Sequence, residues 1–213
     1  MHLADATTRA AFPQAATGQL AVGLNEFLPI QLLLDTCATV QEAQEVLLLN
    51  KHYYRSVPVH LLIADRAGNS FVWEYGSVHN TEHIIRGKQQ PQIITNFLLH
   101  CHSLDDFSGE MDGDRNNAEN RFRILQREIQ STSTGYTPDF VRHVNQKVFY
   151  LDPIPQGKTA SSTIERTLFH NIYDLDEKMV SISFYLGEGE ETKTENTKNA
   201  NVIRSEYIDF ILN

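Results

Sequence analysis

The chain has 213 residues, of which 41% are hydrophobic and 21% charged, and this composition is typical of a globular domain. Its formal net charge is -9 and it contains no cluster of Lys and Arg, which argues against a nucleic-acid-binding protein, because neutralising phosphates requires clustered cations. No apolar run approaches the roughly 20 residues of a membrane span. Residues 1–17 lack the apolar core of a secretory signal, so we expect a disordered lead-in and a cytoplasmic protein.

The two cysteines, Cys37 and Cys101, are too few for a disulfide framework. Both lie in apolar-rich stretches, which predicts a buried structural thiol at each position.

The histidines raise the question of a metal site. Imidazole and thiolate are ligands that suit zinc. On a strand, however, alternate residues face opposite ways, which would separate Cys101 from its two neighbouring histidines. The stretch from His79 to His83 is not an HExxH signature, and its surroundings indicate a loop. We therefore predict no metal site and no cofactor; the histidines considered are His79, His83, His100 and His102.

The first predicted helices lie between Pro29 and Asn50. The segment Thr39-Val40-Gln41-Glu42 has the pattern of a capping box, in which the threonine hydroxyl and the glutamate carboxylate satisfy backbone N–H groups. Apolar residues then recur at helical spacing over residues 40–50. We expect two short helices separated by the cap.

Strands are predicted next. Val59–Ala64 and Ser70–Tyr75 are apolar, β-favouring runs joined by the turn-forming residues 65–69, which indicates a hairpin. A third strand is expected at Pro91–Asn96, because Ile93-Ile94-Thr95 strongly favours extended structure.

The second half repeats this order. A helix is predicted over residues 117–130, and Thr137-Pro138 is typical of another helix start. Thr167–Tyr173 and Met179–Leu186 then form a second predicted hairpin. The polar stretch 187–201 predicts a flexible loop, and residues 202–213 a segment that docks back on the domain. Helices, strands, helices and strands in this order indicate the α+β class.

Several of these segments resemble one family in order and spacing. The stretch Leu33 to Ala43 reads LLDTCATVQEA, and His60 to Tyr75 has the pattern H-x-L-x-A-D-x-x-G-x-S-x-x-x-E. Ile94-Thr95-Asn96, Asn120-Arg121-Phe122 and the closing hairpin over 167–186 follow in the same order. Together they are similar to the cysteine N-terminal-nucleophile (Ntn) amide hydrolases that include choloylglycine hydrolases, penicillin V acylases and isopenicillin-N acyltransferase-like proteins.

The resemblance implies part of a four-layer αββα sandwich, lacking its N-terminal strands, with residues 18–186 as the C-terminal portion of the domain. It also implies a reaction in which an N-terminal cysteine attacks an amide carbonyl while its own α-amino group serves as base. Water or another amine then resolves the acyl-enzyme. The implied partner is a small-molecule acyl amide substrate.

The resemblance implies catalytic roles for two residues of this sequence, Asn96 and Arg121. Asn96 matches the asparagine that contributes to the oxyanion hole, although an asparagine here could instead cap the strand end. Arg121 matches an arginine that lies near the nucleophile and favours its thiolate. The alternative for Arg121 is a helix-surface residue that pairs with Glu119 or Asp114.

Other polar residues of the first hairpin have a structural interpretation. Asp65 and Glu74 could be paired carboxylates for acid–base work, but in the matching hairpin they are a turn residue and a strand carboxylate. His60 is expected to pack or to form a hydrogen bond.

The nucleophile itself is not found. The sequence begins Met1-His2-Leu3 and has no cysteine before Cys37, which lies in the helix motif where the family carries a non-catalytic cysteine. We therefore expect a fragment of a linear amide C–N hydrolase or acyltransferase that is inactive alone. The alternative is a non-catalytic module that binds acyl ligands. Whether a homo-oligomer or a missing N-terminal half completes the protein stays open.

Overall fold

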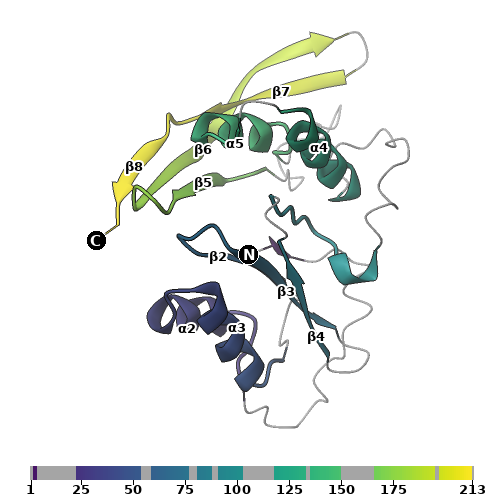
Figure 1. Cartoon of the computed structure of the whole chain (residues 1–213). Helices are drawn as coiled ribbons and strands as arrows, with labels where there is room; N and C mark the ends of the chain where they lie inside the picture. Colours follow the sequence, from purple (N-terminus) through teal and green to yellow (C-terminus); the bar gives the residue numbers. More distant parts are fainter. Residues whose placement is uncertain are drawn as a thin grey trace. The chain divides into compact units, whose positions relative to one another are not determined.

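The computed structural model describes residues 2–3, 23–53, 59–76, 81–87, 91–102, 118–132, 135–149, 166–194 and 197–212. The chain divides into two compact units. Unit 1 comprises Met1–Asp112 and Ala118–Gln126, and unit 2 comprises Gly113–Asn117 and Arg127–Asn213. Figure 1 gives the elements in chain order, and each unit is described by itself below.

Unit 1 begins with the predicted helix pair, α2 (Leu28–Thr36) and α3 (Val40–Leu49). The capping box between them is present in full. The Thr39 hydroxyl accepts the Glu42 N–H, and the Glu42 carboxylate accepts the N–H groups of Ala38 and Thr39 at 2.7 and 3.0 Å. The prediction of two short helices split by a cap is confirmed.

The sheet of unit 1 has the order β1-β2-β3-β4 and is antiparallel throughout. Its strands are β1 (His2–Leu3), β2 (Val59–Ala64), β3 (Ser70–Gly76) and β4 (Thr81–Arg86). The predicted hairpin is confirmed as β2 and β3. Asp65 organises its turn, because its carboxylate accepts the N–H groups of Asn69 at 3.0 Å and of Val40 at 3.1 Å.

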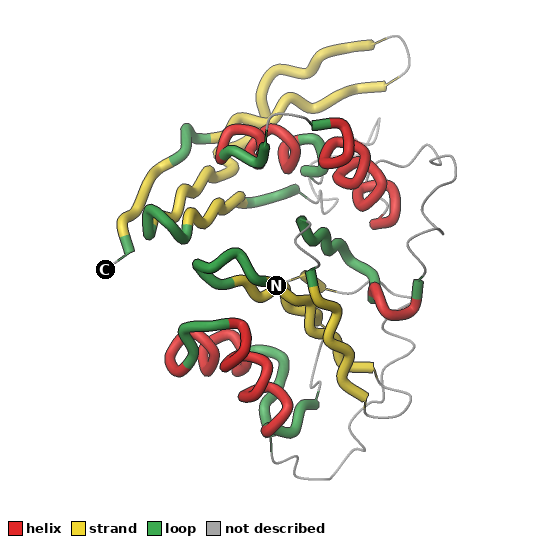
Figure 2. The backbone as a smooth tube through the Cα atoms, in the orientation of Figure 1, coloured by secondary structure: helices red, strands yellow, loops and turns green. Residues whose placement is uncertain are grey.

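The third predicted strand, Pro91–Asn96, is wrong. The edge of β3 is taken by Thr81–Arg86 instead, and residues 91–96 follow as irregular chain (Figure 2). Pro91 has no N–H to donate to a sheet ladder. The side chain of Gln92 donates to the Ile85 carbonyl at 2.8 Å, so this segment is attached to β4 by a side chain rather than by strand pairing.

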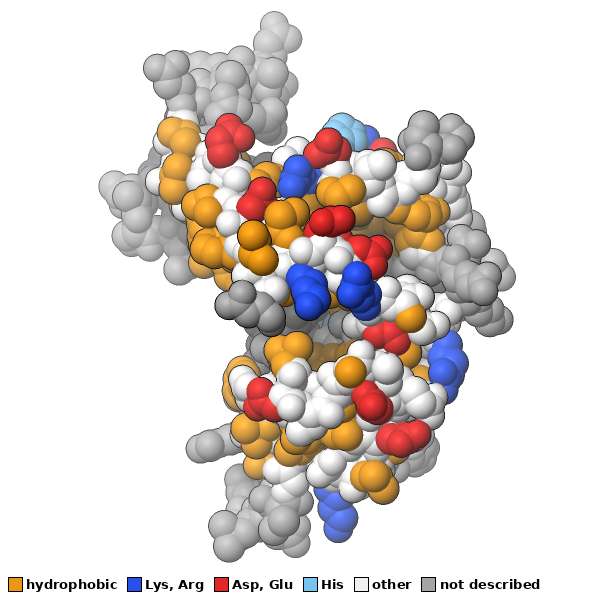
Figure 3. All heavy atoms as spheres, turned by 60° about the vertical axis from the view of Figure 1, so that its left-hand side comes forward, with side chains coloured by type: hydrophobic (Ala, Val, Ile, Leu, Met, Phe, Trp, Pro, Cys, Tyr) orange, Lys and Arg blue, Asp and Glu red, His pale blue; other side chains and the backbone are white. Residues whose placement is uncertain are grey.

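The main core of unit 1 lies between α2, α3 and one face of the sheet. Side chains alternate along β3, so one set of residues faces the helices and the other set the opposite face. Leu47 is fully buried, which is worth about 1.5–3 kcal/mol for a side chain of this kind. The buried members are Leu33, Ala43, Leu47, Leu61, Phe71, Trp73 and Tyr75. The outer sides of the two helices still expose leucines, notably Leu34 and Leu49, and apolar side chains are visible on this part of the surface (Figure 3).

Two further elements follow the sheet. The short 3-10 helix η1 spans Leu99–Cys101, and α4 spans Ala118–Ser131, of which 118–126 belong to unit 1. The prediction of a helix near 117–130 is confirmed. A second small core joins them, formed by Phe97 and Phe122, whose rings meet edge to face at 5.4 Å.

Unit 2 contains α5 (Pro138–Gln146) and a second antiparallel sheet. Thr137 caps α5 by accepting the Phe140 N–H at 3.2 Å, as its sequence predicts. In the sheet, β5 (Phe169–Asp174) pairs with one edge of β6 (Met179–Thr194). The other edge of β6 pairs with β8 (Ile208–Ile211) and with β7 (Thr197–Arg204). The closing hairpin is therefore confirmed as β5 and β6.

The polar stretch 187–201 differs from its prediction. The sequence predicts an irregular loop, whereas the structure continues β6 to Thr194 and returns through β7. The two strands pair antiparallel, and hydrogen bonds of this kind are formed by backbone groups, which polar residues carry as well as apolar ones. The last residues pair with β6 as β8, consistent with a segment that docks on the domain.

A polar cluster occupies the α5 side of this second sheet. The Nδ1 of His170 and the Tyr207 hydroxyl are 2.5 Å apart, and the Arg142 guanidinium lies 4.8 Å from the Tyr207 ring centre. Burial, then the charges of Arg204 and Arg142, lower the pKa of His170 to about 4. The imidazole is therefore neutral at pH 7, and its Nδ1 shares a hydrogen bond with the Tyr207 hydroxyl.

Two antiparallel sheets with helices make this an α+β protein, as predicted. Among the described helices, none has both the length and the apolar character that a bilayer crossing requires.

Candidate active site

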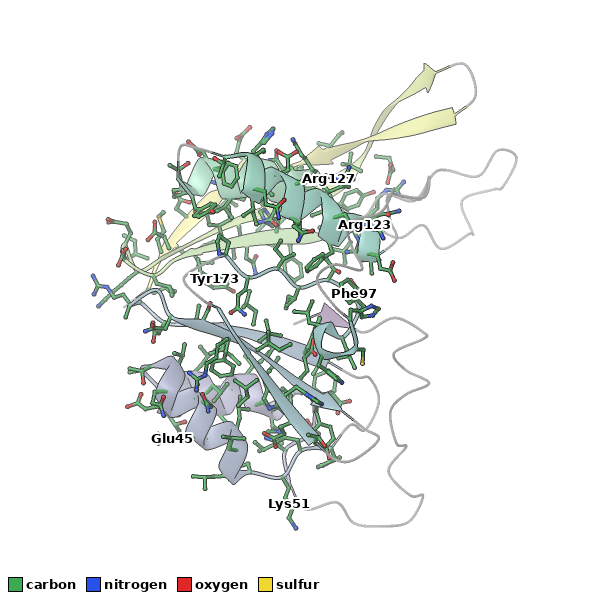
Figure 4. All side chains as sticks on the ribbon, turned by 45° about the vertical axis from the view of Figure 1, so that its right-hand side comes forward. Glu45, Lys51, Phe97, Arg123, Arg127 and Tyr173 are labelled. Carbon is green, nitrogen blue, oxygen red and sulfur yellow. The ribbon has the colours of Figure 1, made fainter. Side chains whose placement is uncertain are left out.

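The two residues predicted to be catalytic lie together in unit 1. Asn96 is held in place by its neighbours on both sides along the chain. The Thr95 hydroxyl donates to the Ala118 carbonyl at the start of α4, at 2.8 Å, and Phe97 is buried against Phe122. Figure 4 shows Phe97 on the segment that leads into η1 and Arg123 on α4. The segment 95–97 is thus attached directly to the first turns of α4.

Arg121 extends from α4 to Asn96. Its Nη2 donates to Asn96 Oδ1 at 2.8 Å. Only the carbonyl oxygen of an amide can accept from a guanidinium, so this bond sets the orientation of the Asn96 amide. The amide nitrogen Nδ2, which is the donor, lies on the other side of the group. The sequence left open a surface pairing of Arg121 with Glu119 or Asp114; Asp114 is outside the described residues.

The residue before Arg121 also has a structural role. Asn120 is buried, and its Oδ1 accepts from Arg123 Nη1 at 3.4 Å. The family resemblance places serine or a similar small polar residue at this position, and Asn120 departs mildly from that pattern.

Glu74 anchors the segment that follows Asn96. Its side chain is completely buried, on the sheet face opposite the α2–α3 core. One carboxylate oxygen accepts the Leu99 N–H at 2.7 Å and lies 3.1 Å from His60 Nδ1. The other accepts the His100 N–H at 3.0 Å and lies 2.7 Å from His100 Nδ1. Glu74 therefore connects β2, β3 and η1.

The charge of Glu74 is stabilised in place. Burial by itself raises the pKa of this carboxyl, but hydrogen bonds from His60, His100 and Leu99 outweigh it, so the pKa lies below its ordinary value. The expectation that Glu74 is a strand carboxylate and that His60 forms a hydrogen bond fits this geometry. Sequence reasoning missed the link to Leu99 and His100, because it joins residues far apart in the chain.

The cysteines differ from their prediction in one case. Cys37 is half-buried and packs against the core of unit 1. Cys101 is exposed, so the prediction of a buried thiol is wrong there. The assumed strand over residues 100–102 is also wrong: η1 brings Cys101 Sγ to 3.3 Å from His100 Nε2.

The predicted site residues are not accompanied by a metal-binding cluster within the described part of the chain. No group of three or more His, Cys, Asp and Glu side chains among them is arranged to hold a metal ion. His79 is outside the described residues, while His83 stacks on His100 with ring centres 3.8 Å apart.

The sequence of residues 15–188 matches the model of the family described as acyl-coenzyme A:6-aminopenicillanic acid acyl-transferase. The chain belongs to this family. The match spans both units and includes Asn96, Glu74 and Arg121. It confirms the group that the sequence motifs indicate. No match was found among curated protein sequences.

A solved structure supports the fold of this acyl-transferase family member. The penicillin V acylase from Agrobacterium tumefaciens is similar with a TM-score of 0.56 and 22% sequence identity. The likeness covers 92% of this chain and 59% of that chain, so the present chain spans little more than half the length of the acylase. The predicted Ntn-hydrolase fold is therefore confirmed.

Proposed function

We propose that this chain provides the oxyanion-binding part of an amide hydrolase or acyltransferase site, with Asn96 as the oxyanion donor. The observation that carries the proposal is the hydrogen bond from Arg121 to Asn96 Oδ1. An oxyanion donor must be oriented before charge develops, since reorientation during the reaction costs energy. Arg121 supplies that orientation, and Glu74 restrains the following segment.

The charge on Arg121 also strengthens the donor. A guanidinium that binds the amide oxygen withdraws electron density from it, which polarises the Nδ2–H bonds toward a developing negative charge. The pair therefore places positive electrostatic potential at Asn96 without adding a group that titrates near neutral pH.

The nucleophile is expected to come from outside this chain. In the family chemistry, a cysteine with a free α-amino group attacks the amide carbon, and the α-amino group takes the thiol proton. That amine has an ordinary pKa of about 8, low enough to accept and return a proton near neutrality. Cys37 is the C-cap residue of α2 and packs against the core, which supports a structural role.

The first test is an amide-turnover assay with penicillin V, fatty acyl amides and bile-salt conjugates, with and without a thiol-blocking reagent. We expect no turnover by the chain alone. We expect thiol-dependent turnover when the polypeptide encoded directly upstream is fused or co-expressed. Robust thiol-dependent turnover of amides by the chain alone would contradict the proposal.

The second test addresses Asn96 in the active form. Loss of one oxyanion donor typically lowers kcat by about 10²–10³-fold, so Asn96→Ala should lower kcat to this extent with little change in KM. Arg127→Ala, an exposed change on the same helix, is the control. Full activity of Asn96→Ala would overturn the assignment.

Ligand binding separates the alternative function. Stabilisation of the chain by acyl amides in a thermal-shift assay, with no turnover in any form, would favour a non-catalytic module that binds acyl ligands.

A further inference from the structure

The exposed thiol of Cys101 lies beside a hydrogen-bonded histidine and a buried carboxylate. Cys101 Sγ is 3.3 Å from His100 Nε2, and His100 Nδ1 is 2.7 Å from Glu74 Oε2. Glu74 is completely buried, whereas Cys101 is exposed to solvent. Thiol, imidazole and carboxylate therefore follow one another from the surface into the interior of unit 1.

The hydrogen bonds define the tautomer of His100. Glu74 carries a charge, since its pKa is lowered, and a carboxylate can only accept. In the neutral form of the imidazole the proton is therefore on Nδ1, where it is donated to Glu74. This leaves the lone pair of Nε2 directed at the thiol, so the Cys101 S–H donates to Nε2. An oriented lone pair of this kind is what a general base requires.

The imidazole ring is held on two further sides. The backbone N–H of His100 also donates to Glu74, at 3.0 Å. His83 of β4 stacks on the His100 ring with an interplanar angle of 6° and ring centres 3.8 Å apart. His83 lies opposite Glu74 in the sheet register, so β3 and β4 together support the ring.

The resting form of Cys101 is the thiol and not the thiolate. Partial burial, and then the negative charge of Glu74, raise the pKa of Cys101 above its ordinary value. Its reactivity must therefore depend on transfer of the proton to His100 during attack. Cys37 provides an internal comparison, because its sulfur lies 3.5 Å from the Thr36 hydroxyl, which is not a base at neutral pH.

We propose that Cys101, His100 and Glu74 form a base-assisted thiol site that accepts an acyl group from small thioesters. Cys101 Sγ forms a bond to the acyl carbon while its proton passes to His100 Nε2. The carbon–sulfur bond of the donor then breaks, and the departing sulfur takes the proton from Nε2. The products are S-acyl-Cys101 and a free thiol, with no change of oxidation state.

Thioesters rather than amides are the chemical class that this site fits. A thiol leaving group departs readily, whereas an amine requires strong stabilisation of the tetrahedral intermediate and protonation as it leaves. The site offers a base and a nucleophile, and this suffices for an activated acyl donor. The inference is independent of Asn96 and of any external nucleophile.

The test uses the Cys37→Ala chain, in which Cys101 is the sole thiol, with S-phenyl thioacetate as the probe. Acetylation is followed by intact mass and thiophenol release. General-base assistance is typically worth about 10²–10⁴-fold, so Cys101 should react at least about tenfold faster than Cys37 does in Cys101→Ser. His100→Phe keeps a ring for stacking on His83 but removes the base, and should lose this advantage. His102→Phe, a change of the other histidine next to Cys101, is the matched control and should keep the faster reaction of Cys101.

Equal rates for Cys101 and Cys37, or an unchanged rate in His100→Phe, would overturn the proposal. A solvent isotope measurement on Cys37→Ala needs no histidine variant and so does not depend on the folding of His100→Phe. Proton transfer during attack predicts a slower reaction in D₂O. An equal or faster reaction in D₂O would indicate attack by a free thiolate and would equally overturn the proposal.

Discussion

Arg121 Nη2 and Asn96 Oδ1 are 2.8 Å apart, and this hydrogen bond joins the first half of α4 to the segment between β4 and η1. Together with the bond from Thr95 to the Ala118 carbonyl, it attaches the irregular segment that carries the candidate oxyanion donor to a helix. A donor supported by a rigid element keeps its direction more accurately than one on a loop.

Removal of the Arg121 side chain should destabilise the protein. Arg121→Ala loses a charge-assisted hydrogen bond, which is worth about 1.5–3 kcal/mol, and should lower the free energy of unfolding in urea by that order. Arg127→Ala is the matched control on the exposed side of the same helix, with an expected change within about 0.5 kcal/mol. Equal effects of the two changes would show that the bond to Asn96 contributes nothing to stability.

Substitution of Glu74 should lower the free energy of unfolding more reliably than substitution of Arg121, because Glu74 is completely buried. In Glu74→Gln one of the two acceptor oxygens becomes an NH₂ group that faces N–H donors, so at least one buried donor loses its partner. We expect a loss of at least about 2 kcal/mol in the free energy of unfolding. Amide hydrogen exchange at Leu99 and His100 should become faster. Glu45→Gln, at an exposed position on α3 (Figure 4), serves as control. Unchanged exchange in Glu74→Gln would contradict the anchoring role.

The same residue predicts a dependence on acid. The pKa of Glu74 is lower in the folded than in the unfolded chain, so its contribution to stability is present above the ordinary glutamate pKa of about 4.3. It is lost as the pH falls through the folded pKa. Urea unfolding from pH 7 downward should therefore show a smaller difference between the native chain and Glu74→Gln at low pH. A constant difference would exclude the charge as its cause.

His170 predicts an effect of pH in unit 2. Its folded pKa of about 4 lies below the ordinary histidine value of about 6.5, so the unfolded chain binds the extra proton first as the pH falls. The contribution of His170 to the free energy of unfolding is complete above about pH 6.5. It declines toward pH 4, by on the order of 2 kcal/mol with allowance for solvent screening. His170→Gln should flatten this decline, whereas His143→Gln, an exposed change on α5, should leave it. An NMR titration that gives His170 an ordinary pKa would contradict the prediction.

The cap of α3 predicts a smaller, local effect. Thr39→Ala removes the side-chain oxygen that accepts the Glu42 N–H at 3.2 Å, and should lower the free energy of unfolding by about 1 kcal/mol. Gln41→Ala, an exposed change in the first turn of the same helix, should change the free energy of unfolding by less than about 0.5 kcal/mol. Thermal unfolding of the two variants side by side checks this; equal stabilities would mean that the helix start does not depend on the cap.

The sequence by itself determined the elements whose signals are local. The capping box at Thr39, the turn held by Asp65 and the Thr137 helix start all depend on groups within a few residues of each other. Such interactions form in nearly the same way wherever the segment lies, so a pattern in the sequence predicts them. Family motifs added Asn96 and Arg121 as candidates, but not their hydrogen bond.

Only the tertiary structure decided which distant segments meet. Thr81–Arg86 took the edge of β3 that Pro91–Asn96 was expected to extend, and the polar stretch after Leu186 paired as strands. Glu74 reached Leu99 and His100 across a wide sequence separation, and a turn of 3-10 helix rather than a strand brought Cys101 to His100. These contacts depend on loop closure and on competition for strand edges and buried hydrogen bonds, which involve the whole chain at once.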